Sequence, residues 1–183
     1  MLVLVLQNFV QIIFEMKIAT ILSAVSLLAA CHTESNPTTL NGTDQDFLQR
    51  MSYADHNEIA GGTIAANMGT VDSVKIFGQM MITGYTSAQS KLDSLAGQLQ
   101  LQLPETADSA HLAFDQQLQS LSGLIFDTTY IAQEVRDHQI LMVTFNDEIS
   151  YGNNQQVKGY ANEFLPIIET NLQTAERIQH NIH

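Results

Sequence analysis

The sequence predicts an all-α protein, a four-helix bundle with an extra short helix between the second and third long helices. Apolar residues recur at steps of three and four almost continuously after Asp44. Turn-forming residues divide this pattern into four long segments, at Gly69-Thr70, at Gly152-Asn153 and across a longer connection in the middle. Four amphipathic helices with one apolar stripe each bury those stripes against one another, which is the architecture of a bundle.

The first two long helices are expected over about 45–67 and about 70–99. The apolar stripe of the first helix consists of Phe47, Met51, Ala54, Gly61 and Ala65. The stripe of the second helix consists of Val74, Phe77, Met81, Ala88, Leu92, Leu95 and Leu99. Thr70 is the candidate N-cap of the second helix, because its hydroxyl can accept a hydrogen bond from the first turn.

The third and fourth long helices are expected over about 122–150 and about 154–180. The stripe of the third helix includes Ile131, Met142, Phe145 and Ile149. The stripe of the fourth helix includes Val157, Ala161, Phe164, Ile168, Ala175 and Ile178. Pro166 lies inside the fourth segment and either kinks one helix or separates two shorter ones, because proline lacks the backbone N–H.

The connection between the second and third long helices is far too long for a tight turn. Residues 107–121 within it could form a short helix. Two arrangements remain open. The connection could cross along the bundle, as in ferritin-like folds, or its short helix could cap the side of the bundle.

The N-terminal region predicts export. Residues 16–30 carry a basic Lys17, an apolar run and small residues at the end, which is the layout of a signal peptide. The sequence Leu28-Ala29-Ala30-Cys31 resembles a bacterial lipobox, in which the cysteine becomes the acylated N-terminus. Cys31 is therefore the expected lipidation site, and residues 31–43 are the expected flexible tether to a bundle domain at 44–183.

Residues 1–15 do not fit a signal peptide, because the acidic Glu15 stands where basic charge is expected. We interpret them as a start-site artefact upstream of Met16. The alternative is one membrane span from Leu2 to Ala30. It would place Glu15 and Lys17 near the centre of the bilayer, where charge is costly.

Composition limits the possible partners. The chain has 19 acidic and 7 basic residues, and loss of Glu15 and Lys17 with the leader leaves 18 against 6, a net charge of −12. Nucleic acid is not an expected partner, because phosphates require Lys and Arg. Membrane attachment is expected through acyl chains on Cys31, most simply at the outer membrane facing the periplasm, and an envelope protein is a possible partner. The single cysteine excludes intramolecular disulfides.

Polar residues interrupt every apolar stripe. Near the middle of the helices these are Glu58, Tyr85, the pair Glu134 and His138, and Asn171. Residues at mid-height meet at one level whichever way the helices run. A buried carboxylate there must be paired, protonated or bound to a metal. Glu58, Tyr85, Glu134 and His138 form a ligand set suited to iron or manganese.

The alternative is a polar core that fixes helix register, in which Glu134 and His138 satisfy each other. Asp127, Tyr130 and Asn171 are expected to belong to that core, with Asp127 bonding near the start of the third helix. A di-iron site would need two Glu-x-x-His motifs, and the chain has a single Glu-x-x-x-His. The other histidines are expected to be mostly solvated: His56, His111, His180 and His183.

Several short motifs in order resemble a bacterial family of exported proteins, the domain of unknown function 4142 family. They are Asn57-Glu58-Ile59, Val74-Lys75-Ile76-Phe77 with Met81, Leu103-Pro104, Leu121-Ser122-Gly123, Phe126-Asp127-x-x-Tyr130, His138 and Leu165-Pro166. The resemblance implies a ferritin-like bundle on an often lipid-anchored, outer-membrane protein. It also implies Asp-His at the positions of Gly84 and Tyr85, and histidine at that of Asn171.

Because this chain replaces those two histidines, the sequence favours a cell-envelope lipoprotein acting as a structural or interaction module. The competing hypothesis is a ferritin-like metal-binding or weakly redox-active envelope stress protein. No nucleophile–base motif or phosphate-binding loop is present, so no catalytic residue is assigned and enzymatic activity is not expected.

Overall fold

The structure of the protein, a computed structural model, describes residues 38–182. The segments interpreted as start-site artefact and signal peptide, the lipidation site Cys31 and the first part of the tether lie outside the described residues. Within residues 38–182, no helix combines the length and the hydropathy needed to cross a bilayer.

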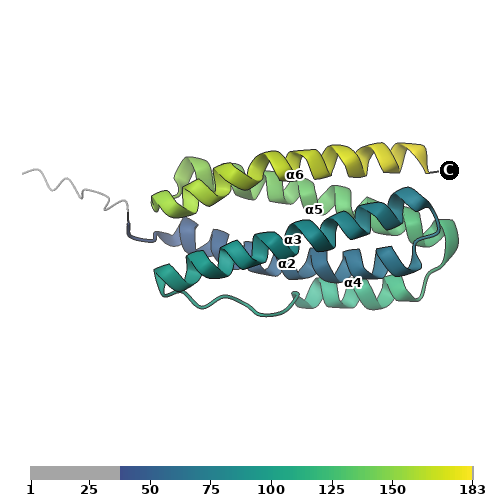
Figure 1. Cartoon of the computed structure of the whole chain (residues 1–183), viewed down its shortest axis with the longest axis horizontal. Helices are drawn as coiled ribbons and strands as arrows, with labels where there is room; N and C mark the ends of the chain where they lie inside the picture. The colour runs from purple at the N-terminus through teal and green to yellow at the C-terminus, as the bar shows by residue number, and fades with distance from the viewer. Residues whose placement is uncertain (1–37, 183) are drawn as a thin grey trace, which may run out of the picture. The chain divides into compact units, whose positions relative to one another are not determined.

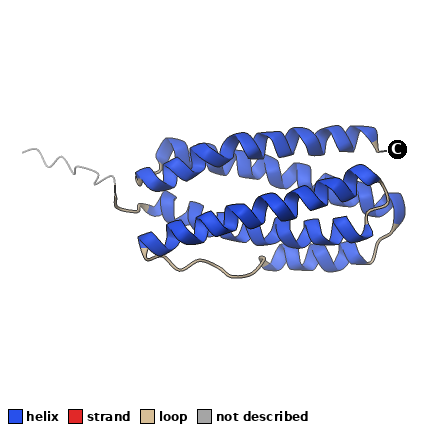
Figure 2. Cartoon of the chain, viewed as in Figure 1, coloured by secondary structure: helices blue, strands red, loops and turns tan. Residues whose placement is uncertain are grey.

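The described chain forms four long helices and one short helix (Figure 1). They are α2 (Gly42–Met68), α3 (Asp72–Leu99), α4 (Ser109–Gln119), α5 (Gly123–Tyr151) and α6 (Gln155–Asn181). No strand occurs among the described residues (Figure 2). The predicted all-α bundle, with its short helix between the second and third long helices, is therefore confirmed.

Hydrogen bonds between distant segments show how α2 and α5 run relative to each other. Asp127, near the start of α5, accepts bonds from the backbone of the turn that ends α2. The amide of Asn41, which precedes α2, donates to the carbonyl of Tyr151 at the end of α5, 3.0 Å away. Thus α2 and α5 run antiparallel. The connection from α3 to α5 must travel the length of the bundle, and α4 lies along α2 and α5 on the way (Figure 1).

The expected N-cap of the second helix is wrong. Val71, not Thr70, is the N-cap of α3, and no side chain of its own caps the helix. Asp127 does this from α5, because its Oδ1 accepts from the N–H of Thr70 and its Oδ2 from the N–H of Val71, both at 2.9 Å. A carboxylate at a helix N-terminus also complements the helix dipole. Asp127 thereby ties α5 to the α2–α3 turn and lies apart from the mid-height polar residues.

Glycine allows the closest helix contact in the bundle. Gly62 on α2 and Gly78 on α3 are both buried, and a Cβ added at Gly62 would lie 2.8 Å from the carbonyl oxygen of Gly78. The two backbones therefore touch directly. By contrast, Pro166 is exposed and α6 continues through it, so the alternative of two shorter helices is wrong.

Candidate metal centre

The polar residues of the apolar stripes are buried together between the helices. Glu58 comes from α2, Tyr85 from α3, Glu134 and His138 from α5 and Asn171 from α6, and none is more than 7% exposed. One carboxyl oxygen of Glu58, one of Glu134 and one ring nitrogen of His138 all lie within 4.8 Å of one another. The structure therefore brings together the residues that the sequence placed at mid-height. We call Glu58, Tyr85, Glu134 and His138 the core cluster.

The imidazole of His138 is fixed in one tautomer. Its Nδ1 lies 2.9 Å from the backbone carbonyl oxygen of Glu134, and a carbonyl only accepts, so Nδ1 carries the hydrogen. Nε2 then has the free lone pair, and it lies 3.0 Å from the hydroxyl of Tyr85, which donates to it. Burial lowers the pKa of His138, which keeps the ring neutral.

This geometry corrects the expected Glu134–His138 pair. The Nδ1 of His138 lies 3.6 Å from the carboxyl Oε2 of Glu134, too long for a hydrogen bond. The partners of His138 are instead the Glu134 backbone and Tyr85. A histidine whose Nδ1–H donates to a carbonyl and whose Nε2 carries the lone pair is arranged as metal-binding histidines are, and here the Tyr85 hydroxyl bonds to that lone pair.

The two glutamates of the core cluster are incompletely satisfied. Glu58 Oε2 and Glu134 Oε2 are buried without a hydrogen-bond partner. Burial, and then the negative charge of Glu134, raises the pKa of Glu58. Burial also raises the pKa of Glu134. In the absence of a cation, at least one proton must therefore reside on this pair, because two adjacent buried carboxylates repel.

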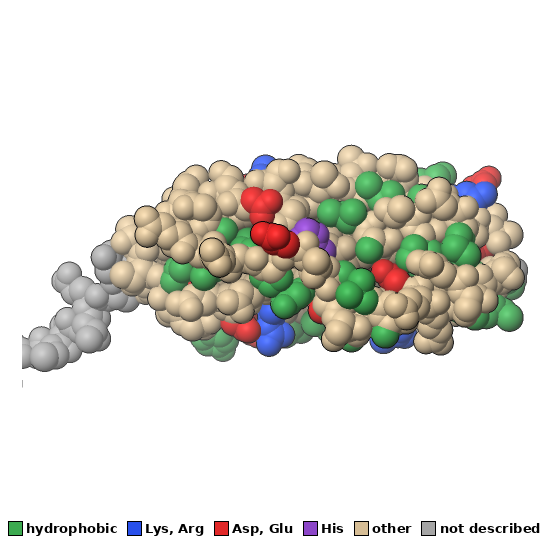
Figure 3. Space-filling view, turned by 90° about the horizontal axis from the view of Figure 1, so that it is seen from below, with side chains coloured by type: hydrophobic (Ala, Val, Ile, Leu, Met, Phe, Trp, Pro, Cys, Tyr) green, Lys and Arg blue, Asp and Glu red, His purple; other side chains and the backbone are tan. Residues whose placement is uncertain are grey.

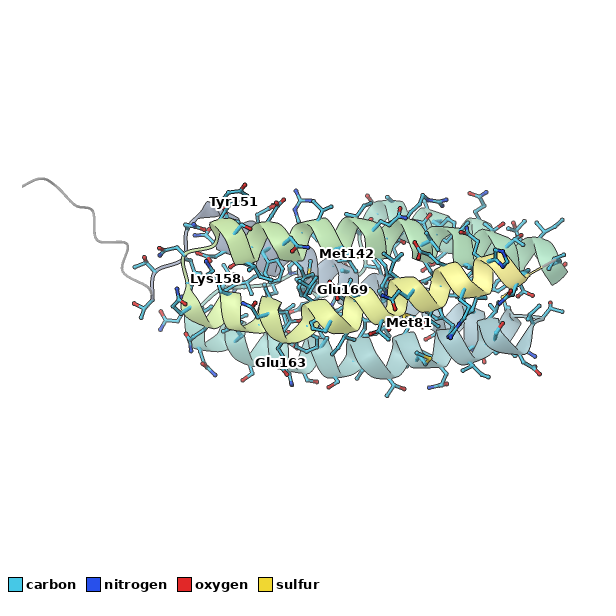
Figure 4. All side chains as sticks on the ribbon, turned by 90° about the horizontal axis from the view of Figure 1, so that it is seen from above. Met81, Met142, Tyr151, Lys158, Glu163 and Glu169 are labelled. Carbon is cyan, nitrogen blue, oxygen red and sulfur yellow. The ribbon has the colours of Figure 1, made fainter. Side chains whose placement is uncertain are left out.

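The two remaining residues expected in the polar core differ in their surroundings. Tyr130 is 1% exposed and its hydroxyl has no hydrogen-bond partner, although it interacts with Glu134. Asn171 interacts with the Tyr85 hydroxyl and so connects α6 to the core cluster. Met81 and Met142, labelled in Figure 4, belong to or pack against the apolar core.

Sequence reasoning missed Asp55, which lies one turn before Glu58 on α2. It is 3% exposed, and its Oδ2 has no hydrogen-bond partner. Burial, and then Asp93, raises its pKa. Asp55 follows Met51 by four residues and precedes Glu58 by three. Helical periodicity therefore predicts that Asp55 shares the buried face of α2, and this spacing could have identified it from the sequence.

His111 is an exception to the expectation that most of the remaining histidines are solvated. The side chain is only 26% exposed and lies between two carboxylates, with Nδ1 2.7 Å from Asp108 Oδ2 and Nε2 3.4 Å from Asp137 Oδ2. The hydrogen bond to Asp137 is the main cause that raises the pKa of His111, to about 9. His111 is therefore an imidazolium at neutral pH, on the face of the bundle that α4 covers.

A second buried acidic pair lies at the end of the bundle where α2 begins. Asp44 accepts backbone bonds from Asn41, Asn153 and Asn154, at 2.6, 2.9 and 3.0 Å. Beside it, Glu148 is fully buried and neither carboxyl oxygen has a hydrogen-bond partner. Burial and Asp44 raise the pKa of Glu148 to about 8, while Lys158 on α6 opposes the shift. Tyr151 and Lys158 mark this end in Figure 4.

The core cluster fits a transition-metal ion. Its donors are carboxylate, imidazole and phenol, a set that suits iron or manganese. Two neighbouring ligands, each about 2.1 Å from a metal, are about 3.0 Å apart in octahedral geometry. Tyr85 Oη and His138 Nε2 lie 3.0 Å apart, which is compatible with that separation and is also the length of the hydrogen bond between them. The unpartnered oxygens of Glu58 and Glu134 supply the negative charge that a cation requires.

Comparison with known proteins places the chain in a family and identifies its fold. A crystal structure of a DUF305 fragment from Deinococcus radiodurans is similar, with a TM-score of 0.64 at 12% identity. The similarity covers 77% of this chain and 97% of the fragment, and at that identity it shows the fold alone. No curated protein matches the sequence. The profile of a family described as "Domain of unknown function (DUF4142)" matches residues 29–178. The chain therefore belongs to the DUF4142 family.

Proposed function

We propose that this protein binds one iron or manganese ion in the core cluster, as a ferritin-like metal-binding protein of the bacterial envelope. The observation that carries the proposal is the pair of buried glutamate oxygens without partners, beside a histidine whose tautomer leaves Nε2 able to ligate. The two carboxyl groups interact through a side-chain hydrogen bond, but one oxygen of each still lacks a partner. Burying such an oxygen is costly, and a bound cation would remove that cost.

Tyr85 and Asn171 also support this proposal, although the sequence alone made them arguments against it. Tyr85 places a phenol oxygen beside Nε2, so the substitution exchanges one metal-binding group for another. Asn171 interacts with that phenol from α6. The site then has the donors of a single ion, held mainly by α2, α3 and α5. No catalytic step is assigned to it.

The cellular setting of the proposal comes from the N-terminal sequence. Cys31 would carry the acyl chains, hold the protein at the outer membrane and leave the bundle in the periplasm. The acidic surface supports attachment through lipid rather than through electrostatic contact with anionic headgroups or nucleic acid.

Metal content tests the proposal. The untagged full chain, purified in mild detergent, would be exposed to iron or manganese, dialysed and measured by mass spectrometry. We expect about one ion per chain in the wild type and in the control His180→Ala, because His180 is exposed and lies in the last turn of α6. We expect less than about a tenth of that amount in His138→Ala. Equal metal in both variants, or none in any of the proteins, would exclude the site.

A second candidate function, an interaction module, is favoured by one surface feature. A groove of about 800 Å³ runs between α2 and α5 and includes Phe47, Ile140 and Val143. Ile140 and Val143 are 59% and 61% exposed, so this groove presents apolar side chains that a partner could cover. A photo-reactive residue at Val143 would cross-link a partner in intact envelopes if the groove is an interface, whereas one at the exposed Glu169 on α6 would not.

A further inference from the structure

A small cavity connects the core cluster to the surface beside α4. It has a volume of about 200 Å³, and its lining includes Asn57, Glu58, Asp108, His111 and Asp137. Glu58 is 4% exposed, and its Oε2 is one of the buried oxygens without a partner. Asp108, His111 and Asp137 have partly exposed side chains. The cavity therefore has a charged outer rim and leads to an unsatisfied carboxyl group.

His111 occupies the rim as a bridge. It contacts Asp108 on one side and Asp137 on the other, and so joins the start of α4 to α5. Asn57 on α2 strengthens the bridge, because its amide lies 2.8 Å from Asp108 Oδ2 and its carbonyl accepts from the Asp108 N–H at 3.1 Å. The imidazolium thus neutralises two carboxylates that would otherwise attract cations. Figure 3 shows the side of the molecule on which α4 lies, with acidic side chains at several places on the surface.

On the side of the bundle that α4 covers, a glycine of α2 lies next to the core cluster. Gly61 on α2 has no side chain there, and a Cβ at that position would lie 3.9 Å from both Asp115 Oδ1 on α4 and Glu134 Oε1 on α5. The carboxyl groups of Asp115 and Glu134 therefore both lie close to Gly61, beside the core cluster. A cation that displaced His111 would find carboxylates at the rim and at Glu58, while the walls between them include apolar side chains such as Met51 and Leu141.

We propose that Asp108, Asp137 and Asn57 form a transient binding site for a hydrated divalent cation, and that His111 is the gate that occupies this site until the cation arrives. The inference rests on the proposed metal-binding function and adds the route by which the ion reaches Glu58. It assigns His111 no place among the final ligands. The gate therefore mainly controls how fast the ion enters and leaves, and its charge, which acts on Glu134, has a smaller effect on the affinity.

The kinetics of manganese binding test the gate. The chain has five tyrosines and no tryptophan, so tyrosine fluorescence reports binding at Tyr85 in a stopped-flow experiment. The full chain in detergent would be mixed with Mn²⁺, and the equilibrium constant would be measured separately from the signal of free Mn²⁺ in electron paramagnetic resonance. Compared proteins would be the wild type, His111→Ala, His111→Gln and the exposed control His180→Ala.

We expect His111→Ala to raise the association and dissociation rates by about tenfold each, because the repelling cation and the bridge are both lost. His111→Gln can keep a neutral bridge, so its rates should lie between those of the wild type and the alanine variant. Because both rates rise together, the dissociation constant should change much less than either rate, and only through the loss of the His111 charge that acts on Glu134. His180→Ala should match the wild type.

The possible failures are distinguishable. Metal binding in the wild type with unchanged rates in both His111 variants would overturn the gate and leave the proposed function standing. A changed dissociation constant with unchanged association rate would make His111 part of the final site and also overturn the gate. Absence of manganese binding in the wild type would overturn the proposed function and the gate together. If His111→Ala does not fold, His111→Gln still tests the gate, because glutamine is close to histidine in size and its rates can be measured in the same way.

Discussion

The hydroxyl of Tyr85 on α3 donates to Nε2 of His138 on α5 across 3.0 Å. This hydrogen bond holds the one histidine nitrogen that could bind a metal, and it places the phenol oxygen where a second ligand would lie. The same pair would also stabilise the bundle without metal, because it joins two helices through a buried polar contact. Metal binding and helix register therefore depend on the same atoms, and the predictions below separate them.

Tyr85→Phe should change the colour of the ferric protein. A tyrosine phenolate bound to ferric iron absorbs visible light, so the wild type loaded with ferric ion should be coloured and Tyr85→Phe should not. Visible absorption spectra would measure this. Tyr160→Phe is the matched control, because Tyr160 is also buried but stacks on Phe164 outside the core cluster. A band that persists in Tyr85→Phe would assign the phenolate to another tyrosine.

Asp127→Asn should destabilise the bundle without affecting metal binding. The amide would keep one acceptor and turn an N–H group toward a backbone donor of the α2–α3 turn. We expect a loss of about 1–3 kcal/mol in the free energy of unfolding, measured with urea. Asp147→Asn, an exposed change on the same helix, should cost less than about 0.5 kcal/mol. If the folded Asp127→Asn variant bound no metal, the claim that Asp127 takes no part in the core cluster would be wrong.

Adjacent glycines on α2 should respond in opposite ways to alanine. Gly62→Ala places a Cβ 2.8 Å from the Gly78 carbonyl oxygen, so α2 and α3 must move apart, at a cost of about 1–3 kcal/mol. Gly61→Ala meets its nearest atom at 3.7 Å and should gain about 0.5–1 kcal/mol from helix propensity. Thermal unfolding of both variants would measure the difference. Equal destabilisation would show that the contact at Gly62 does not limit helix approach.

The stability of the metal-free protein should fall as pH rises from about 4.3 toward 8. The unfolded chain releases the proton of Glu148 near the ordinary pKa of about 4.3. The folded protein retains it to about 8, because Glu148 is buried beside Asp44. The folded state therefore binds more protons in this window. The stability that this proton contributes is fully present below pH 4.3 and is lost through pH 8.

Urea unfolding at pH 5 and pH 8 in the presence of a chelator would measure this dependence. Glu148→Gln should reduce the difference between the two pH values by about 1–3 kcal/mol, since an amide does not titrate. Asp55 and Glu58, whose pKa values are also raised, contribute to the remaining slope in the same direction, whereas the lowered pKa of His138 opposes it below about pH 6.5. Glu169→Gln, an exposed change, should retain the full difference. An unchanged slope in Glu148→Gln would show that Glu148 is ionised in the folded protein.

Local sequence pattern accounts for the helices, because each is specified by residues close together in the chain. The expected 70–99 and 122–150 segments correspond to α3 (Asp72–Leu99) and α5 (Gly123–Tyr151). The same periodicity places Glu58 and His138 on inward faces. Residues whose partners are distant in sequence could not be assigned in this way. Glu148 meets Asp44 more than a hundred positions away, and Asp127 caps a helix other than its own.

His111 illustrates the second limit of sequence reasoning. Its hydrogen bond to Asp108 is local, three residues away, and belongs to the first turn of α4. Its contact with Asp137 exists only because α4 packs against α5. The topology of the connection therefore had to be known before the histidine could be placed. Sequence alone left that topology open.

Anomalous diffraction from a crystal of the full chain grown with manganese tests the central claim most directly. We expect one strong anomalous peak about 2.0–2.3 Å from donor atoms of Glu58, Tyr85, Glu134 and His138. In that state the hydrogen bond between Tyr85 and His138 would be replaced by two metal–ligand bonds. A core cluster without a peak, with the Tyr85–His138 hydrogen bond intact at saturating manganese, would contradict the account and identify these residues as a polar core that fixes helix register.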